Sequence, residues 1–337
     1  MDAFARKTEA ERRAFFEEVA NRRGVLPIII EKDFWVCWTL KKLFDDPHTA
    51  PYLTFKGGTS LSKAYGLIER FSEDIDLTIS REAPFLNEGK NPVEEGISGK
   101  ERGRRIEALK GNAQRFVEET VLARLMTQIG KALGGTEGWR LLIDIDDPDR
   151  QTILFNYPRT ASEAAGYVKP TIKLEFGARG GTEPQNATTI TPYIAEVFPK
   201  SFQEATCSPA TLSVTRSFWE KVTILHALCH GSKMRDRMSR HYYDTFMMDQ
   251  KGVTEEALAD PALLGLVVQN KTLFFRDPWA SYETAQIGTL RLVPEGMTLQ
   301  ALKKDYKAME EMFMADFPNF ETVLDGMAVL EARINNR

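Results

Sequence analysis

A pair of aspartates, Asp74 and Asp76, lies in the stretch EDIDLTIS at residues 73–80. Apolar and polar residues alternate through this stretch, which predicts a β-strand with both aspartates on one face. Two carboxylates so placed can share a divalent cation, and Mg²⁺ favours hard carboxylate oxygens together with water and substrate phosphates. Phosphoryl and nucleotidyl transfer need such a cation to neutralise the phosphates. The pair is therefore the first candidate for a catalytic metal site.

A glycine-containing turn precedes this pair, and we expect it to cradle a triphosphate. Its residues are Gly57, Gly58, Thr59 and Ser60, directly after a predicted strand at 52–56. Glycine lets the backbone approach a phosphate closely. The two hydroxyl residues begin a predicted helix over 59–69, where free N–H groups and the helix dipole attract phosphate. Lys63, one turn later, is expected to add a positive charge.

A second aspartate pair, Asp144 and Asp146, also alternates on a predicted strand. It leads directly into Asp147-Pro148-Asp149, a composition that favours a tight turn. No glycine-rich phosphate loop precedes it. We therefore predict that Asp144 and Asp146 are surface residues beside a turn and that the metal pair is Asp74 and Asp76.

Other side chains with possible chemical roles are better explained by packing. His226 and His230 have an i, i+4 spacing that resembles metal ligands on a helix, but no third ligand accompanies them. The aromatic residues Phe34, Trp35 and Trp38 follow helical spacing, which favours a buried helix face over base stacking. We predict core or helix-surface positions for all five.

The surrounding elements predict an α+β fold. Its first domain, residues 1–204, would be a mixed sheet flanked by helices, and residues 205–337 would form an all-helical domain. We expect helices at 8–23, 31–46 and 100–132, a hairpin at 138–157 and a strand at 168–178. Gly24 and Pro27 are interpreted as helix-stop signals between the first two helices.

Composition narrows the class of protein. The chain has 337 residues with 42% hydrophobic and 27% charged residues, close to the average for a globular protein. It contains no run of 18 or more apolar residues, so no membrane span is expected. The N-terminal segment lacks the apolar core of a signal peptide. Three scattered cysteines suit a reducing compartment. We therefore expect a cytoplasmic protein.

A net charge of −4 excludes nucleic-acid binding through bulk charge, although local basic patches remain possible binding surfaces. Two stretches are rich in basic residues. They comprise Lys100, Arg102, Arg104, Arg105, Lys110 and Arg115, and then Lys233, Arg235, Arg237 and Arg240. Each stretch is either a path for a phosphate backbone or an ordinary solvated helix face.

The segment FKGGTSLSKAYGLIERFSEDIDLTI, at residues 55–79, resembles the signature of the AbiEii/AbiGii-type nucleotidyltransferase toxins. That family shares a polymerase-β-like nucleotidyltransferase core. Three further segments resemble family motifs in the same order along the chain. They are IIIEKDFWVCWTL (28–40), FWEKVTILHAL (218–228) and SRHYYDTFMM (239–248).

The resemblance implies roles for particular residues. Asp74 and Asp76 match the metal-binding pair, and Lys221 matches a lysine that the family places near the nucleotide phosphates. Asp244 matches the acidic residue of the last motif, where it would orient the acceptor or Lys221. Here the sequence reads Arg-His-Tyr-Tyr-Asp (240–244) and lacks the Lys-Asp pair that usually precedes Tyr-Asp, which could signal a different substrate.

Enzymes of this core often take a third carboxylate from a neighbouring strand, and Glu175 is the candidate because it alternates with apolar residues in 168–178. Lys173 on the same face offers the alternative of a plain surface ion pair. Arg179, just after the strand, is either a phosphate contact or a turn residue. Because Asp74 and Asp76 come from one half of the chain and Lys221 and Asp244 from the other, we expect the active site in a cleft between the domains.

The resemblance implies an enzyme that moves a nucleoside monophosphate from an NTP to an acceptor hydroxyl, with Mg²⁺ or Mn²⁺ as cofactor. It further implies the toxin of a bacterial toxin–antitoxin or abortive-infection (phage-defence) pair, with a separate antitoxin protein as partner. RNA, in particular the 3′ end of tRNA, is the leading acceptor because some relatives use it. One alternative is nucleotidylation of a protein side chain. Another is a catalytically silent module that binds a nucleotide or a partner.

Overall fold

The computed structural model describes residues 1–160, 169–202, 204–231, 236–314 and 316–337. The chain divides into two compact units. The first consists of Met1–Ala64 and Phe71–Thr211, and the second of Tyr65–Arg70 and Leu212–Arg337. The chain therefore leaves the first unit after Ala64, returns at Phe71 and leaves it again after Thr211.

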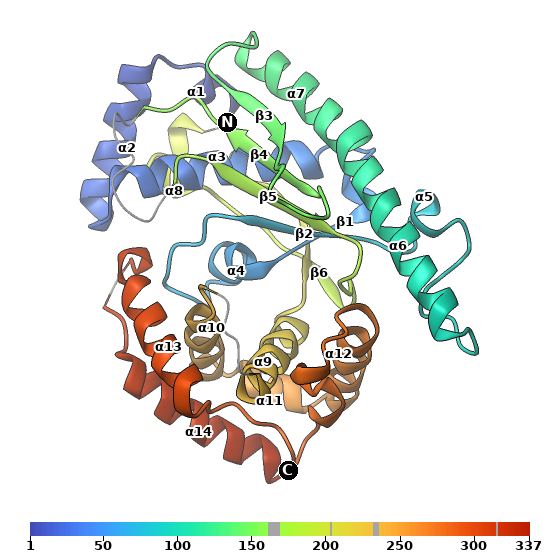
Figure 1. The fold of residues 1–337 in the computed structure, drawn as a ribbon. Helices are drawn as coiled ribbons and strands as arrows, with labels where there is room; N and C mark the ends of the chain where they lie inside the picture. Colours follow the sequence, from blue (N-terminus) through green and yellow to red (C-terminus); the bar gives the residue numbers. More distant parts are fainter. Residues whose placement is uncertain (161–168, 203, 232–235, 315) are drawn as a thin grey trace. The chain divides into compact units, whose positions relative to one another are not determined.

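A seven-stranded mixed sheet forms the centre of the first unit (Figure 1). The strand order is β3-β4-β5-β2-β1-β7-β6. The pairs β1–β2, β3–β4 and β4–β5 are antiparallel, whereas β2–β5 and β1–β7 are parallel. The strands are β1 (Leu53–Lys56), β2 (Ile75–Ile79), β3 (Arg140–Ile143), β4 (Thr152–Asn156), β5 (Ile172–Gly177), β6 (Gln185–Ala187) and β7 (Ala210–Leu212). The predicted α+β fold with a mixed sheet is confirmed. Of the strand predicted at 168–178, residue 168 lies outside the described residues.

Helices flank this sheet, and the most buried of them is α3 (Pro27–Phe44). Its aromatic residues Phe34, Trp35 and Trp38 have no exposed surface, so their predicted packing role is confirmed. Pro27 was interpreted as a stop signal, but it occupies the first turn of α3. Proline suits this position because its missing N–H would be unpaired there anyway. The other helices of this unit outside 99–133 are α1 (Asp2–Ala5), α2 (Glu9–Arg23), η1 (Ala50–Tyr52), α4 (Gly57–Thr59), η2 (Ser60–Ala64), α5 (Pro84–Asn87), α8 (Tyr193–Val197) and η4 (Pro199–Ser201).

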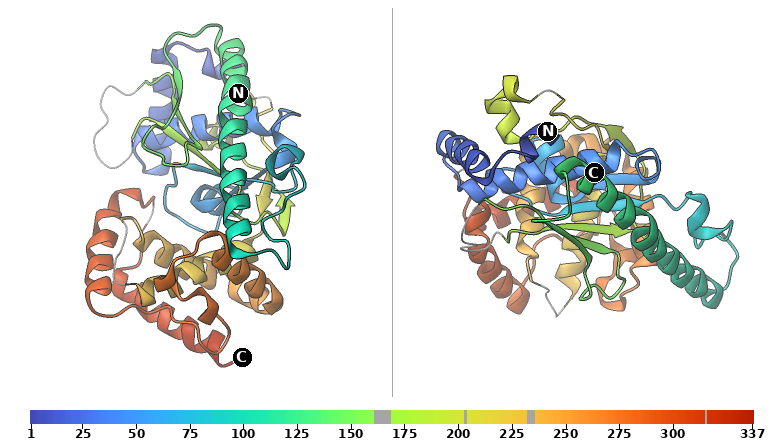
Figure 2. Two further views of the ribbon diagram at one scale, coloured as in Figure 1. Left: turned by 45° about the vertical axis from the view of Figure 1, so that its right-hand side comes forward. Right: turned by 90° about the horizontal axis from the view of Figure 1, so that it is seen from above.

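A long helix runs through the predicted range 100–132 as three consecutive segments, which Figure 2 shows as one rod. They are α6 (Gly99–Arg115), the π-helical η3 (Phe116–Leu122) and α7 (Ala123–Leu133). Residues of η3 contact β3 and β4, so the apolar stripe of this helix covers the sheet. The predicted helix is confirmed, with one wider turn in its middle.

The segment after β1 differs from the prediction. The helix begins at Gly57 and not at Thr59, because α4 starts directly after β1 with Lys56 as its N-cap. It continues as the π-helical segment η2 and ends at Ala64, five residues before the predicted end at Glu69. The two glycines therefore form the first turn of the helix itself.

The hairpin predicted at 138–157 is confirmed, and its turn is fixed by aspartate side chains. Asp144 Oδ1 accepts a hydrogen bond from the Asp146 N–H at 3.1 Å. The prediction that both aspartates lie on the surface is wrong for Asp144, which is only 8% exposed, whereas Asp146 is exposed. Its Oδ2 lies 3.5 Å from Lys173 Nζ, so the carboxylate has a cationic partner in this position.

Helices are the main elements of the second unit in its described residues (Figure 1), apart from Leu212 of β7 and an isolated backbone bridge between Arg70 and Phe313. Helix α9 contacts α10, α11 and α12, and α10 also contacts α13 and α14. The α-helices are α9 (Val214–His230), α10 (Ser239–Gln250), α11 (Val253–Leu258), α12 (Pro261–Phe274), α13 (Gly296–Ala308) and α14 (Phe320–Asn335). Short 3₁₀ segments are η5 (Pro278–Ala280), η6 (Tyr282–Thr284) and η7 (Glu310–Met312). Among the described helices of both units, none combines the length and the apolarity needed to cross a bilayer.

Candidate functional site

Asp76 lies in the middle of the sheet with a charged residue at the same register on each side. It pairs with Lys56 of β1 and with Glu175 of β5. Residues at the same register on adjacent strands project from the same face. The sheet therefore brings Glu175 beside Asp76, as expected for a third carboxylate.

Asp74 immediately precedes β2 and is held by the helix that follows β1. Its carbonyl oxygen accepts a hydrogen bond from the Thr59 hydroxyl. Thr59 is fully buried, so this contact fixes the start of β2 against α4. Asp74 and Asp76 are both half-buried, with alternate residues Ile75 and Leu77 in the core.

Gly57 packs directly against the Asp76 carboxylate. Its φ is +80°, and a Cβ atom placed on it would lie 1.8 Å from Asp76 Oδ2. Such a separation is impossible, so the Asp76 side chain can take its position only because residue 57 is glycine. The turn thus helps to set the carboxylate, a role that the sequence analysis did not assign to it.

Replacing this glycine is expected to displace the carboxylate. In Gly57→Ala the new methyl group must push Asp76 aside, and a shift of about 1 Å at a reacting centre costs about 10²-fold in rate. We expect nucleotidyl transfer to fall by about that factor. Gly103→Ala is the matched control, because its Cβ would meet nothing within 4 Å in helix α6. Equal transfer rates for the two variants would show that the Gly57 contact does not position Asp76.

The remaining predicted phosphate ligands make internal contacts. Ser60 is fully buried, and its hydroxyl donates to the Gly57 carbonyl oxygen at 2.9 Å. Lys63 Nζ lies 2.8 Å from Asp33 Oδ1 and 3.5 Å from the centre of the Tyr193 ring. Burial lowers the pKa of Lys63, but Asp33 and other neighbouring groups outweigh it and raise the pKa, so the ammonium stays charged. The roles of Ser60 and Lys63 in binding phosphate stay predictions, whereas their contacts within the protein are observed.

The donor set around Asp76 fits a divalent cation of the Mg²⁺ type. Asp74, Asp76 and Glu175 supply only hard carboxylate oxygens, which Mg²⁺ and Mn²⁺ accept. Within the described residues, no three His, Cys, Asp or Glu side chains are already gathered around one point that could hold a metal. Mg²⁺ is commonly held by one or two carboxylates, while substrate phosphates and water complete its shell.

The two predicted residues of the second unit contact each other. Lys221 Nζ of α9 donates to Asp244 Oδ2 of α10 at 2.6 Å. Arg70 completes the cluster, since its Nε and Nη2 donate to the two Asp244 oxygens at 2.7 and 2.8 Å. Asp244 has no exposed surface. Lys221 is 8% exposed and supplies one of the two cations for this carboxylate.

The cluster determines the charge of its members. Burial would raise the pKa of Asp244, but Arg70 and Lys221 outweigh it and hold the pKa well below its usual range. Burial lowers the pKa of Lys221 despite the attraction of Asp244. Burial, Lys221 and Arg240 lower the pKa of His241, which therefore stays neutral near pH 7. The altered motif before Asp244 thus places a neutral imidazole beside an ionised carboxylate.

Arg70 is the residue that the sequence analysis missed. It lies four positions before Asp74, in a segment that resembles the family signature, but its partner Asp244 is 174 residues away. Asp74, Asp76 and Glu175 belong to the first unit, and Lys221 and Asp244 to the second. Joint use of the two groups stays a prediction.

The histidine pair does not form a metal site. The His226 Nδ1 atom accepts a hydrogen bond from the Arg291 N–H at 3.1 Å, and its Nε2 lies 3.2 Å from the Ser281 carbonyl oxygen. Both ring nitrogens are therefore engaged by the protein. Burial lowers the pKa of His226 to about 4. The predicted packing role of His226 is confirmed.

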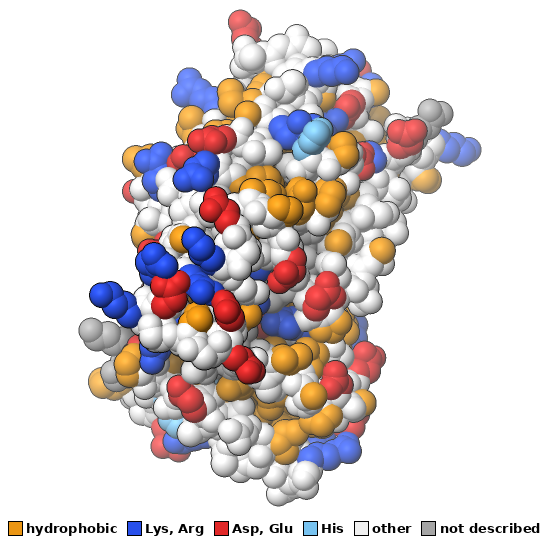
Figure 3. Space-filling view, turned by 90° about the vertical axis from the view of Figure 1, so that its right-hand side faces the viewer, with side chains coloured by type: hydrophobic (Ala, Val, Ile, Leu, Met, Phe, Trp, Pro, Cys, Tyr) orange, Lys and Arg blue, Asp and Glu red, His pale blue; other side chains and the backbone are white. Residues whose placement is uncertain are grey.

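Three of the six basic residues in the stretch on α6 form ion pairs with acidic neighbours. Arg104 and Arg105 both pair with Glu101, and Lys110 pairs with Asp149. On the face drawn in Figure 3, Lys and Arg side chains are interspersed with Asp and Glu. This pattern favours the solvated-face interpretation of α6. In the second basic stretch, Lys233 and Arg235 lie outside the described residues.

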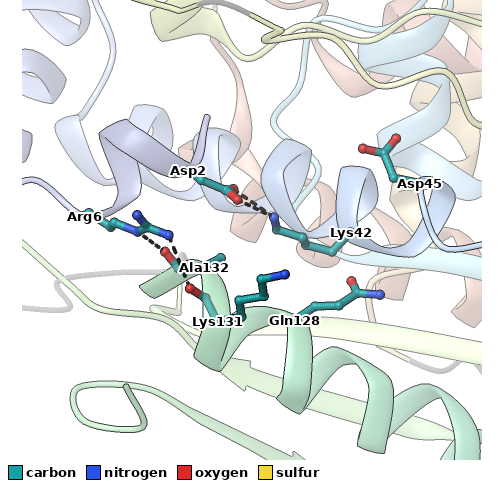
Figure 4. Close-up of a pocket in the computed structure, with 7 residues that line it drawn as sticks. All are labelled: Asp2, Arg6, Lys42, Asp45, Gln128, Lys131 and Ala132. Atoms are coloured by element: carbon teal, nitrogen blue, oxygen red, sulfur yellow. Dashed lines mark hydrogen bonds and ion pairs between the residues drawn. The ribbon is translucent and has the colours of Figure 1, made fainter. Parts of the chain in front are cut away.

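A cavity of about 320 Å³ lies elsewhere in the first unit (Figure 4). Arg6 donates to the carbonyl oxygens of Lys131 and Ala132, and Lys42 donates to both oxygens of Asp2. Its lining contains none of the predicted site residues. The cavity is therefore separate from the carboxylates of the sheet.

Comparison with known proteins relates the chain to one protein family and to solved structures. The sequence model of a family described as the nucleotidyl transferase AbiEii toxin of type IV toxin–antitoxin systems matches residues 38–326. No curated protein matches significantly. Among solved structures, MenT4, a nucleotidyltransferase toxin from Mycobacterium tuberculosis H37Rv, is similar with a TM-score of 0.46 and 15% identity, over 96% of this chain and 99% of that chain. The family match spans every predicted site residue.

Proposed function

Because the chain belongs to the AbiEii family of nucleotidyltransferase toxins, we propose that it transfers a nucleoside monophosphate from an NTP to an RNA 3′ hydroxyl with the help of a divalent cation. The observation that carries the metal-dependent part is the register of the sheet, which sets Asp76 beside Glu175. Asp74 and Gly57 support it by fixing the start of the strand and the position of the Asp76 carboxylate.

In the proposed reaction, the acceptor hydroxyl gives up its proton to solvent and its oxygen forms a bond to the α-phosphorus. The bond from that phosphorus to the bridging oxygen breaks, and pyrophosphate leaves. Asp74, Asp76 and Glu175 would hold Mg²⁺ or Mn²⁺, which when bound neutralises the phosphates. The amides at the start of α4 would face the phosphates, because Gly57 and Gly58 carry no side chains there. Lys221, held by Asp244, would contribute positive charge to the same reaction.

RNA is the proposed acceptor, and a transfer assay with labelled substrates tests it. The protein is incubated with each labelled NTP, Mg²⁺ and either total cellular RNA or total cellular protein. We expect label in RNA, with tRNA as the main product, and no label when periodate has first oxidised the 3′-terminal diol. The Asp74→Ala/Asp76→Ala variant should label neither fraction.

Other results of this assay would change the proposal. Label in protein, dependent on the same aspartates, would favour nucleotidylation of a side chain. Nucleotide binding without transfer under any condition would leave only the binding-module alternative. Label in RNA that survives periodate oxidation would exclude the 3′ end as the acceptor site.

The family description also places these toxins in type IV toxin–antitoxin systems. We propose that a separate antitoxin protein protects the host cell from this enzyme, that both act in the cytoplasm and that the pair limits phage infection. Growth arrest on expression in a bacterial host, abolished by Asp76→Asn, would support the toxic role.

A further inference from the structure

Lys56 lies beside Asp76 on the neighbouring strand and has no role in the site described so far. It is the last residue of β1 and pairs in register with Asp76. No hydrogen bond or ion pair engages its ammonium group within the described part of the chain. By contrast, Lys63 and Lys173 are each paired with a carboxylate. Lys56 is thus an uncommitted positive charge at the candidate metal site.

Thr78 places an unsatisfied hydroxyl at the same point of the sheet. It follows Asp76 by two residues on β2 and therefore projects from the same face. The residue is 1% exposed, and its Oγ1 has no hydrogen-bond partner among the described residues. A buried hydroxyl without a partner is destabilising, and a ligand atom in contact with it would remove that cost.

Gly180 packs closely beside both groups. A Cβ atom on it would lie 2.9 Å from Thr78 Oγ1 and 3.2 Å from Lys56 Nζ. The bend that contains Gly180 is held in place by Arg81, whose Nη1 donates to the carbonyl oxygens of Arg179 and Gly180 at 3.0 and 3.2 Å. A cation, a hydroxyl donor and a side-chain-free backbone therefore meet beside the metal-binding strand.

We propose that Lys56, Thr78 and Gly180 form a subsite for the β- and γ-phosphates of the nucleotide. The proposal rests on the function proposed above. It assigns to Lys56, in place of Lys63, the positive charge that contacts the triphosphate. Thr78 lies one strand repeat from Asp76, about 6.6 Å along β2. A triphosphate lying along this strand reaches Lys56 and Thr78 with its terminal phosphates while its α-phosphate stays near Asp76. The ammonium and the hydroxyl both donate to phosphate oxygens, and the absence of a side chain at Gly180 avoids a clash with either group.

Nucleotide binding without turnover tests this subsite. The probes are the four α,β-methylene nucleoside triphosphates and the four monophosphates, measured by calorimetry with Mg²⁺ and no acceptor. We expect Lys56→Gln to weaken binding of the preferred triphosphate by tenfold to about a hundredfold, because a charge-assisted hydrogen bond is lost. Binding of the corresponding monophosphate should change less than about twofold. Lys56→Arg should recover part of the triphosphate affinity, and Lys90→Gln, at an exposed lysine, should alter neither ligand.

A second variant tests the same space with the lysine intact. In Gly180→Ala the methyl group occupies the position between Thr78 and Lys56, so triphosphate binding should again weaken selectively. Gly111→Ala, whose Cβ would meet nothing within 4 Å, is its control.

Three results would overturn the subsite: unchanged triphosphate binding by Lys56→Gln, equal loss of triphosphate and monophosphate, or failure of all four triphosphates to bind the unaltered protein. Selective loss of triphosphate binding without any transfer activity would instead overturn the proposed function and leave the subsite standing.

Discussion

Asp76→Asn is expected to lower the rate of nucleotidyl transfer by about 10³-fold or more while the protein remains folded. The substitution keeps the size of the side chain and removes only its charge, so its contact with Gly57 survives. What is lost is the carboxylate that, beside Glu175, neutralises the charge of the cation and its phosphates. Single-turnover transfer with saturating NTP and Mg²⁺ measures the effect.

Asp146→Asn is the matched control for this prediction. Asp146 is exposed in the turn of the β3–β4 hairpin. Its backbone N–H donates to Asp144 Oδ1, and this hydrogen bond does not involve the Asp146 side chain. We expect transfer within about twofold of the unaltered enzyme. A loss comparable with that of Asp76→Asn would mean that the metal pair was assigned to the wrong strand. If excess Mn²⁺ restores the transfer rate of Asp76→Asn, the substitution has weakened metal binding.

The second large effect concerns stability. Asp244→Ala leaves Arg70 and Lys221 buried without their carboxylate, and breaking a buried ion cluster in this way costs about 3–5 kcal/mol. We expect the free energy of unfolding, measured by urea denaturation, to fall by that amount. Glu321→Ala removes an exposed partner of Lys303 in the same unit and should change the free energy of unfolding far less, because solvent screens an exposed ion pair. A similar small loss for Asp244→Ala would show that the cluster contributes little net stability.

The cluster also predicts a pH dependence. Arg70 and Lys221 hold the pKa of Asp244 below its unfolded value against the opposing effect of burial, so the folded state favours the ionised form. The corresponding stability is fully present above an unfolded pKa of about 3.9 and is lost as the pH falls towards the folded pKa. Between pH 7 and pH 3, the gap in unfolding free energy between the unaltered protein and Asp244→Ala should therefore narrow. A constant gap over this range would contradict the depressed pKa.

The elements of the site could be predicted wherever a local pattern encodes them. Alternation predicted β2 and β5, and Thr8 with Glu11 forms the capping box that begins the predicted helix α2. The register between β2 and β5 joins segments far apart in the chain, so no local pattern could show that Asp76 faces Glu175. The sequence analysis placed both residues on strands with the correct faces, and the pairing of the strands supplied the rest.

Contacts were missed where the partner of a residue is distant in the sequence. Lys63 was predicted at the phosphates, and its ion pair with Asp33 of α3 could not be foreseen; its role with phosphate stays a prediction. Asp144 was predicted at the surface, but it is buried beside Lys173 of β5. The helix start at Gly57 was missed because glycine has a low helix propensity. There the contact with Asp76 makes glycine necessary and overrides that propensity.

The path of the chain between its two units limits how this enzyme can be divided. The units are joined at residues 64/65, 70/71 and 211/212, because Tyr65–Arg70 belongs with the C-terminal helices. A gene fragment that ends at Thr211 would still encode Arg70 but would lack Asp244, and it would also lack Phe313, whose backbone bridges to that of Arg70. In such a fragment, the Arg70 guanidinium, which is buried in the full protein, would lose the Asp244 carboxylate as its partner. No single division of the gene separates the two units, because each division leaves residues of one unit on the fragment that encodes the other. We therefore expect an engineered split version of the protein to need both fragments in the same cell.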